Sequence, residues 1–180
     1  MAREITFGAV QKKIDDALVR HEYDTAKNQI RYFLHNFLTY YLALNGITNV
    51  ERKKSKDGNP SDYDRICALE DKQIISRRYA DVLHGIRKST NELSHIDDDI
   101  FSGKDEALVY VTLESNYKAF IAMVAILLPD YQTINFNIIP SCKTESMSKT
   151  TSKIRITKVS TTTAVTDTVV KSGKIKIHKK

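Results

Sequence analysis

Apolar residues recur at helical spacing through most of residues 1–140. Between residues 2 and 22 they fall at positions typical of one amphipathic helix: Ile5, Val10, Ile14, Leu18 and Val19. A stronger pattern follows Asp24, which we expect to cap a second helix that ends before Gly46. Its broad apolar face comprises Ile30, Phe33, Leu34, Phe37, Leu38, Tyr41 and Leu42. The second helix is therefore the clearest core element that the pattern predicts.

Three more helices are predicted after a polar loop at residues 47–60. Ser61 and Asp64 have the spacing of a capping box, which favours a helix start there. The apolar spacing then predicts a long helix over residues 74–96 and a fifth over 105–128. In the fifth, the apolar positions are Leu108, Val111, Phe120, Ile121, Val124 and Leu127. These elements predict an all-α fold, a four-to-five-helix up-and-down bundle spanning residues 1–140.

Beyond Pro140 the composition changes to Ser, Thr and Lys, so residues 141–152 are predicted to be a linker. Within 153–180, apolar residues alternate with basic or polar ones, and Ser172-Gly173 offers a turn. This predicts a small β-hairpin or meander in a basic C-terminal tail. Because an isolated hairpin is marginally stable in water, we expect the tail to pack on the bundle, on another subunit or on a partner.

The net charge of +6 is unevenly distributed along the chain. Residues 141–180 hold ten Lys or Arg against two Asp or Glu, whereas residues 1–140 hold eighteen against twenty. A basic tail can contact nucleic-acid phosphates, so its cations are predicted nucleic-acid-binding residues: Lys153, Arg155, Lys158, Lys174 and Lys176. A tail that serves only to keep the protein soluble is the alternative interpretation.

Several classes of protein are disfavoured by the sequence. It has neither an apolar run of membrane-spanning length nor a signal-peptide pattern, so we expect a cytoplasmic protein with no membrane partner. Cys67 and Cys142 lack a CxxC arrangement or a neighbouring His, which argues against a zinc site. We expect the carboxylates of the consecutive residues Asp97–Asp99 to point in different directions, and the run lacks calcium-loop spacing. We therefore predict no metal site and no cofactor.

The strongest chemical pattern is formed by Arg87, Asn91 and His95, which follow one another at intervals of four residues. On one continuous α-helix this spacing places a cation, an amide and a group that titrates near neutral pH along one face. Attack of a ribose 2′-OH on the adjacent phosphate needs a base, an acid and a cation that stabilises the charged phosphorane. His95 can serve as base or acid, Arg87 as the clamp, and Asn91 can orient His95 or bind a phosphate oxygen.

The wider string resembles the HEPN family of RNA-cleaving and RNA-binding proteins. Residues Leu83 to His95 match the pattern Leu-His-x-x-Arg-x-x-x-Asn-x-x-x-His of one HEPN branch. The resemblance implies a helical bundle, frequent homodimerisation and metal-independent RNA cleavage at a cleft where the motif helices of two subunits meet. His84, the leading His of the pattern, would then be a structural or supporting residue beside the catalytic residues. Residues 141–180 have no part in the resemblance.

One departure concerns the arginine. The commonest HEPN signature, Arg-x(4–6)-His, has arginine directly before the polar residue, where this chain has Thr90; Arg87 lies one turn earlier. Arg78 and His84 satisfy that signature literally and form a competing match. We favour the longer pattern, because position 79 is a Tyr where the family has a small polar side chain, and because His84 is already accounted for.

These observations predict a HEPN-like metal-independent ribonuclease that acts on RNA as a homodimer. A role as a toxin or host-defence effector, with an antitoxin or other partner protein, follows from the resemblance alone. The alternative is a non-catalytic HEPN-like dimeric module that binds nucleic acid or a protein through its cleft and basic tail.

Overall fold

The computed structural model describes residues 5–51, 58–95, 103–138 and 140, and this part of the chain is all-α. Its elements are α1 (Phe7–Val19), α2 (Tyr23–Leu44), α3 (Asp62–Asp71), α4 (Arg77–Glu92), the 3₁₀ turn η1 (Leu93–His95), α5 (Gly103–Leu127) and the 3₁₀ turn η2 (Tyr131–Thr133). The five α-helices pack as a bundle, which confirms the predicted fold class. The chain divides into two units, Met1–Thr144 and Glu145–Lys180, and all these elements belong to the first. The predicted linker and β-strand tail lie outside the described residues.

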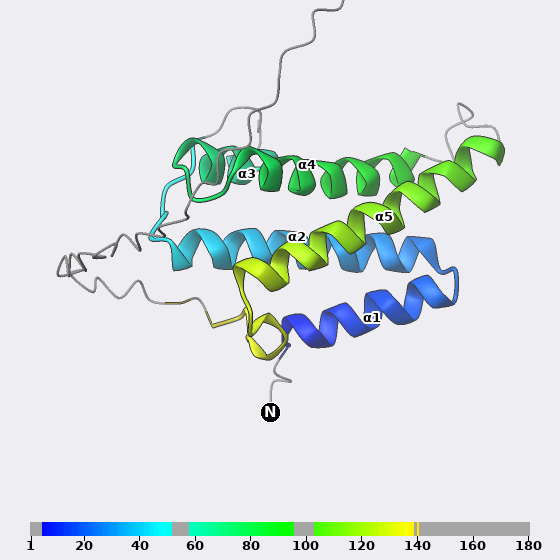
Figure 1. The fold of residues 1–180 in the computed structure, drawn as a ribbon, viewed down its shortest axis with the longest axis horizontal. Coiled ribbons are helices and arrows are strands. Elements are labelled where there is room, and N and C mark those ends of the chain that lie inside the picture. The colour runs from blue at the N-terminus through cyan, green and yellow to red at the C-terminus, as the bar shows by residue number, and fades with distance from the viewer. Residues whose placement is uncertain (1–4, 52–57, 96–102, 139, 141–180) are drawn as a thin grey trace, which may run out of the picture. The chain divides into compact units, whose positions relative to one another are not determined.

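Helix α2 is the central element of the bundle. It contacts α1 on one side and α3 and α4 on the other, while α5 packs mainly on α4 and crosses obliquely in front of α2 (Figure 1). The predicted apolar face explains this position, because all seven of its residues are buried. No helix within the described ranges is both long and apolar enough to cross a bilayer.

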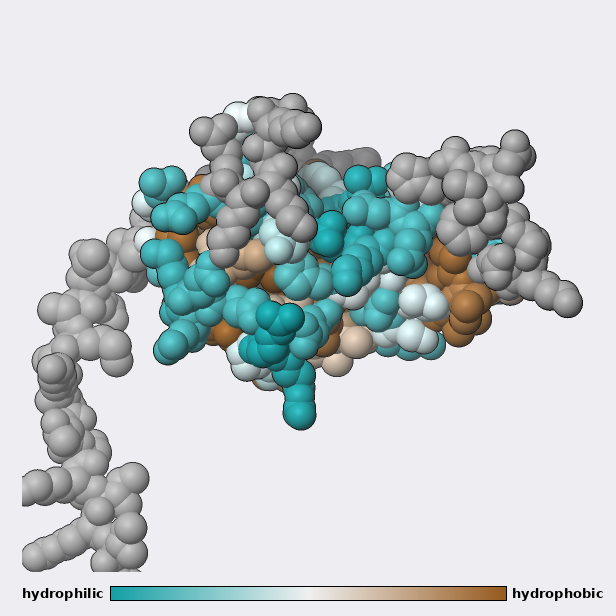
Figure 2. All heavy atoms as spheres, turned by 90° about the horizontal axis from the view of Figure 1, so that it is seen from above, coloured by the Kyte–Doolittle hydropathy of each residue, from teal (hydrophilic) through white to brown (hydrophobic). Residues whose placement is uncertain are grey.

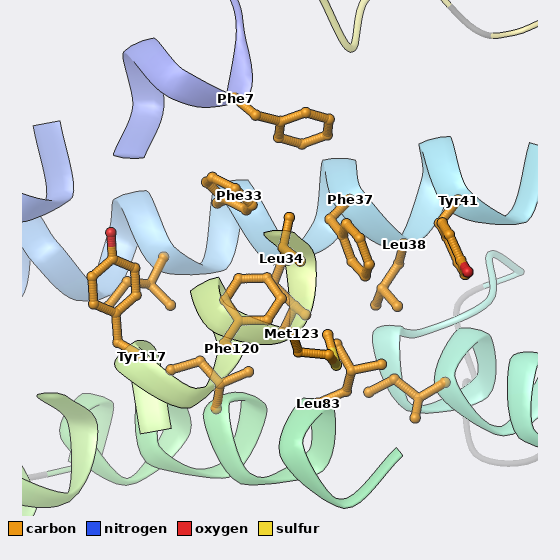
Figure 3. Close-up of a cluster of buried hydrophobic side chains, with 14 of the residues drawn as sticks. Phe7, Phe33, Leu34, Phe37, Leu38, Tyr41, Leu83, Tyr117, Phe120 and Met123 are labelled. Atoms are coloured by element: carbon orange, nitrogen blue, oxygen red, sulfur yellow. The ribbon is translucent and has the colours of Figure 1, made fainter. Parts of the chain in front are cut away.

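An aromatic cluster joins α1, α2 and α5 in the core. Phe120 of α5 makes T-shaped contacts with Phe33 and Phe37 of α2, at ring-centroid distances of 5.4 and 5.8 Å, and Phe7 of α1 lies 5.0 Å from Phe33. Figure 3 shows Phe120 between the α2 rings and Leu83 of α4. These five side chains have no exposed surface. Each buried ring removes a large apolar area from water and so contributes to the stability of the helix packing.

Local signals account for how the helices begin and end. The Ser61 hydroxyl accepts a hydrogen bond from the backbone N–H of Asp64, whose carboxylate accepts from the Ser61 N–H, so the predicted capping box is confirmed. The N-cap of α2 is Glu22 rather than Asp24, which lies in the first turn and pairs with Lys27. The helix ends as predicted before Gly46, whose φ of 70° is the left-handed conformation that glycine adopts without strain.

The two ends of the bundle unit meet beside α1. The backbone N–H of Phe7 donates to the carbonyl of Ile134, and Thr6 forms an isolated antiparallel bridge with Asn135. Gly8 permits this approach, because a Cβ at that position would lie only 2.7 Å from the carbonyl oxygen of Gln132. The segment after α5 is thereby tied to the first turn of α1.

Three expectations about helix limits and faces are wrong. The long helix predicted over 74–96 is α4 followed by the tighter turn η1, so the α-helical period ends at Glu92. Leu108 and Val111 are 65% and 61% exposed, because the inner face of α5 is formed by other residues, including Leu113. Val19, predicted on the apolar face of the first helix, is 81% exposed.

Candidate functional site

Part of the sequence motif on α4 serves to pack the helix. Ser89 is buried; its hydroxyl donates to the carbonyl of Gly85 and accepts a hydrogen bond from the Asn116 amide of α5. The buried Thr90 hydroxyl donates to the carbonyl of Arg87. These bonds satisfy the buried hydroxyls, and the one between Asn116 and Ser89 joins α5 to α4 and helps to fix the rotation of α4. The rotation in turn decides which motif residues face away from α5.

Arg87 and Asn91 line one hollow of about 190 Å³ between α2, α3 and α4, here called the Asn91 hollow. The predicted grouping of these two residues is therefore observed. The remaining lining residues are Arg31, Leu34, Ser61, Asp62, Tyr63 and Thr90. Arg31 comes from α2, so a second cation that the motif did not include reaches the same hollow. Its position follows from the packing of α2 on α4 and could not be predicted from the spacing of the motif.

The charges around the Asn91 hollow leave it cationic. Its carboxylate, Asp62, is engaged by Arg65 Nη1 at 3.2 Å and by His35 Nδ1 at 3.1 Å. Arg31 donates to the Ser94 hydroxyl at 3.3 Å. Among the described residues, neither Arg31 nor Arg87 has a carboxylate within ion-pair distance. An anion that enters this hollow meets two arginines and an amide that can donate hydrogen bonds.

A second hollow of about 450 Å³ lies on the other side of Arg87, between α3 and α4, and is here called the His84 hollow. It is lined by Tyr63, Cys67, Glu70, Arg77, Asp81, His84, Gly85, Arg87 and Lys88. Arg77 is paired with Glu70 at 3.0 Å and with Asp81 at 3.2 Å, so these three charges largely offset one another. Arg87 and Lys88 are the remaining cations.

Tyr63 and Arg87 are common to both hollows. The Arg87 Cζ lies 5.6 Å from the centroid of the Tyr63 ring, a cation–π distance, and the His84 ring lies 5.2 Å from the same centroid. Two nitrogens beside this cluster, Arg87 Nε and His84 Nδ1, are buried without a hydrogen-bond partner in the described part of the chain. Buried polar atoms normally have a partner, so these two nitrogens are an exception in the described part of the chain.

The environment of His84 favours its neutral form. Burial, and next the positive charge of Arg87, lower the pKa of its imidazole below the ordinary value of 6.5. A neutral imidazole near pH 7 can accept a proton. The sequence motif predicts His84 as a supporting residue beside the site, and in the structure it shares a hollow with Arg87. The motif does not predict the contact of Tyr63 with both side chains.

His95 ends the turn η1, and its side chain is not among those that the structure describes. The change of helix type affects where its backbone lies. On an α-helix, two residues four positions apart are separated by about 40° around the helix axis, so Asn91 lies close to the face that carries Arg87. With the tighter 3₁₀ period after Glu92, ideal geometry places the Cα of His95 about 140° from that of Arg87, against about 80° on a continuous α-helix. The predicted line of three residues on one face is therefore broken after Asn91.

The other residues considered for the site lie elsewhere. Arg78, the arginine of the competing match, is exposed in the first turn of α4 and lines neither hollow. Within the ranges that the structure describes, no three His, Cys, Asp or Glu side chains gather as they would around a metal ion. The Asp97–Asp99 run and the tail residues Lys153, Arg155, Lys158, Lys174 and Lys176 are outside those ranges.

Comparisons with family models, with curated proteins and with solved structures gave no match to this chain.

Proposed function

We propose that this protein is a HEPN-like ribonuclease that cleaves RNA without a metal ion. The observation that supports this most is the position of Arg87, whose guanidinium lies between two hollows with Asn91 on one side and His84 on the other. The two arginines of the Asn91 hollow, Arg87 and Arg31, suit a phosphodiester. The resemblance of residues 83–95 to one HEPN branch supplies the reaction class.

In the proposed reaction, Arg87 and Asn91 hold the non-bridging oxygens of the scissile phosphate. A neutral histidine takes the proton of the ribose 2′-OH as the O2′–P bond forms and the P–O5′ bond breaks. The leaving O5′ takes a proton from a second acid. We assign the base to His84, because it shares a hollow with Arg87 and its pKa is lowered, and the acid to His95. Arg87 also stabilises the charge that develops on the phosphorane.

The remaining parts of the proposal rest on the sequence. The basic tail, with its proposed β-hairpin, would bind RNA outside the cleavage site through Lys153, Arg155, Lys158, Lys174 and Lys176. A homodimer in the cytoplasm, acting as a toxin or defence effector controlled by a partner protein such as an antitoxin, is what the family resemblance suggests.

The alternative function is a non-catalytic HEPN-like module that binds RNA or a protein at the same hollows. The end of the α-helical period at Glu92 favours it, because His95 then leaves the face that Arg87 and Asn91 share. On this reading the two arginines and Asn91 bind an anion, and no proton is transferred.

Incubation of the protein with a labelled single-stranded RNA in EDTA separates the two functions. The ribonuclease proposal predicts cleavage to 2′,3′-cyclic phosphate ends, with the rate lowered by about 10²- to 10⁴-fold in His84→Ala or His95→Ala. His21→Asn is the matched control, since His21 is exposed and lines neither hollow, and asparagine tolerates its positive φ of 58°. Binding of the RNA without cleavage by the parent protein would support the non-catalytic module and contradict the enzyme.

A further inference from the structure

A carboxylate lies in the Asn91 hollow beside its two arginines. Asp62, the first residue of α3, lines this hollow together with Arg31, Arg87 and Asn91. The Asp62 side chain is 25% exposed, so a ligand in the hollow can reach it. A carboxylate at this place weakens the binding of a bare phosphate, because like charges repel. The position of Asp62 therefore needs a reason of its own if the hollow binds an RNA phosphate.

The structural role of Asp62 does not require the hollow. An Asp in the first turn of a helix interacts favourably with the helix dipole and can pair with a cation three residues later. Asp62 pairs in this way with Arg65 at 3.2 Å. Asp24, in the first turn of α2, pairs likewise with Lys27 at 2.8 Å, and it lines neither hollow. The two aspartates share a structural role, and only Asp62 lies beside the arginines.

The two carboxylate oxygens of Asp62 have different surroundings. Arg65 Nη1 and His35 Nδ1 both approach Oδ1, at 3.2 and 3.1 Å. Within the described ranges, no side chain forms an ion pair or hydrogen bond with Oδ2. A carboxylate oxygen accepts hydrogen bonds and donates none, so Asp62 can accept one from a hydroxyl or N–H group of a ligand. The arginines attract the anionic part of the same ligand.

A ligand that fits this hollow carries an anion and a hydrogen-bond donor close together. A ribose attached to a phosphate has this chemistry, since its 2′-OH is a donor that deoxyribose lacks. The hollow measures about 190 Å³, below the roughly 300–1,000 Å³ of pockets that enclose a whole small molecule, so it suits a sugar and its phosphate without the base. Figure 2 views the bundle unit from the side of α3 and α4, where hydrophilic residues cover much of the described surface. Such a surface suits a sugar–phosphate backbone.

We propose that Asp62 accepts a hydrogen bond from the 2′-OH of the leaving nucleotide and so makes the Asn91 hollow select RNA over DNA. This inference rests on the proposed function, in which Arg87 binds the scissile phosphate. His84 lies in the other hollow, so the attacking ribose belongs on that side of Arg87 and the leaving nucleotide enters the Asn91 hollow. Asp62 is thus a residue that determines specificity, while the attacking hydroxyl gives its proton to His84.

Binding of two dinucleotides to the full chain, measured by isothermal titration calorimetry, tests the role of Asp62. The ligands are deoxyuridylyl-uridine and deoxyuridylyl-deoxyuridine, both methylated at the terminal 3′-OH, and they differ only in the 2′-OH of the second nucleotide. Neither can be cleaved, because the first nucleotide lacks the attacking hydroxyl. We expect the parent protein to bind the ligand with the 2′-OH about tenfold more tightly, the effect of one hydrogen bond to a charged group.

The direction of the change in the variants separates recognition from a structural role. Asp62→Ala removes both an acceptor and a negative charge. The preference should therefore fall to about one, while the affinity for the fully deoxy ligand rises by up to about fivefold. Asp62→Asn keeps the size of the side chain and accepts through a neutral oxygen, so it should give an intermediate preference. Asp24→Ala is the matched control and should leave both affinities unchanged.

Equal affinity of the parent protein for the two dinucleotides would overturn the inference. So would an equal loss of both affinities in Asp62→Ala and Asp62→Asn, which would assign Asp62 to the fold alone. A parent protein that binds neither ligand would overturn it as well and would contradict phosphate binding by Arg87. The cleavage assay in EDTA distinguishes failure of the enzyme: a protein that does not cleave RNA but keeps the tenfold preference would contradict only the ribonuclease proposal.

Discussion

The guanidinium of Arg87 lies over the ring of Tyr63, with Cζ 5.6 Å from the ring centroid. This contact joins α4 to the first turn of α3 and holds the cation at the border of the Asn91 and His84 hollows. The His84 ring packs against the same tyrosine at 5.2 Å. One aromatic side chain thus sets the positions of the two α4 residues to which we assign phosphate binding and proton transfer.

The Tyr63–Arg87 contact should be measurable as a coupling energy. A double-mutant cycle of Tyr63→Leu and Arg87→Gln, followed by urea unfolding, should give a coupling of about 0.5–1 kcal/mol, as expected of a partly exposed cation–π pair. The matched control pairs Tyr63→Leu with Arg78→Gln, at an exposed position on the same helix, and should be additive. Equal coupling in both cycles would show that the tyrosine does not act through Arg87.

Stability should depend on pH through His84. Its pKa is lowered in the folded state, so between the unfolded value of about 6.5 and the folded value only the unfolded chain binds the proton. Stability is therefore fully present above pH 6.5 and is lost as the pH falls from there towards the folded pKa. We expect His84→Gln to lose less stability than the parent on acidification, measured as the difference in unfolding free energy between pH 7 and pH 5. Parallel curves for the two proteins would contradict this assignment.

The sequence pattern was most informative where a helix has one apolar and one polar side. Every apolar position predicted on α2 is buried. Polar residues occupy the other side of this helix, so only one of its faces could pack in the core. Helix α5 is not divided in this way into one apolar and one polar side. Leu108 and Val111 were placed in the core, whereas Val109 and Leu113 occupy it. With apolar residues on all sides, periodicity does not determine which face the rest of the bundle covers.

The sequence motif predicted that Arg87 and Asn91 lie together, but not which side chains of other helices surround them. The spacing of Arg87 and Asn91 placed them on one face because they lie within one regular α-helix. Tyr63 and Arg31 come from other helices, and their approach depends on how α2 and α3 pack on α4. The switch to a 3₁₀ turn at Leu93 had no clear signal, because residues 86–92 continue the helical pattern and include neither Gly nor Pro.

The aromatic cluster should dominate the stability of the bundle. Phe120→Ala removes a fully buried ring that contacts both Phe33 and Phe37, and should cost about 3–5 kcal/mol in urea unfolding. Val19→Ala, which also shortens an apolar side chain but at an exposed position, should change stability by less than about 0.5 kcal/mol. A loss of similar size in both variants would show that Phe120 is not a core residue.

The basic tail should contribute an RNA affinity that depends on salt. Replacing Lys153, Arg155, Lys158, Lys174 and Lys176 by Gln keeps the length of the chain but removes five charges. RNA binding measured by fluorescence anisotropy at several salt concentrations should weaken and show a shallower salt dependence, since each phosphate contact to a single strand contributes a slope of about 0.7. Binding with an unchanged slope would assign the tail to another partner.

The central claim is that Arg87 contacts the RNA phosphate, and the sharpest test compares Arg87→Ala with Arg78→Ala. Both remove one arginine from α4, but only Arg87 lines the two hollows. We predict that Arg87→Ala lowers kcat/KM for a single-stranded RNA by about 10- to 100-fold, the effect of losing a hydrogen bond to a charged group, and that Arg78→Ala leaves it unchanged. Activity that is lost in Arg78→Ala and retained in Arg87→Ala would contradict the account and favour the pair of Arg78 and His84.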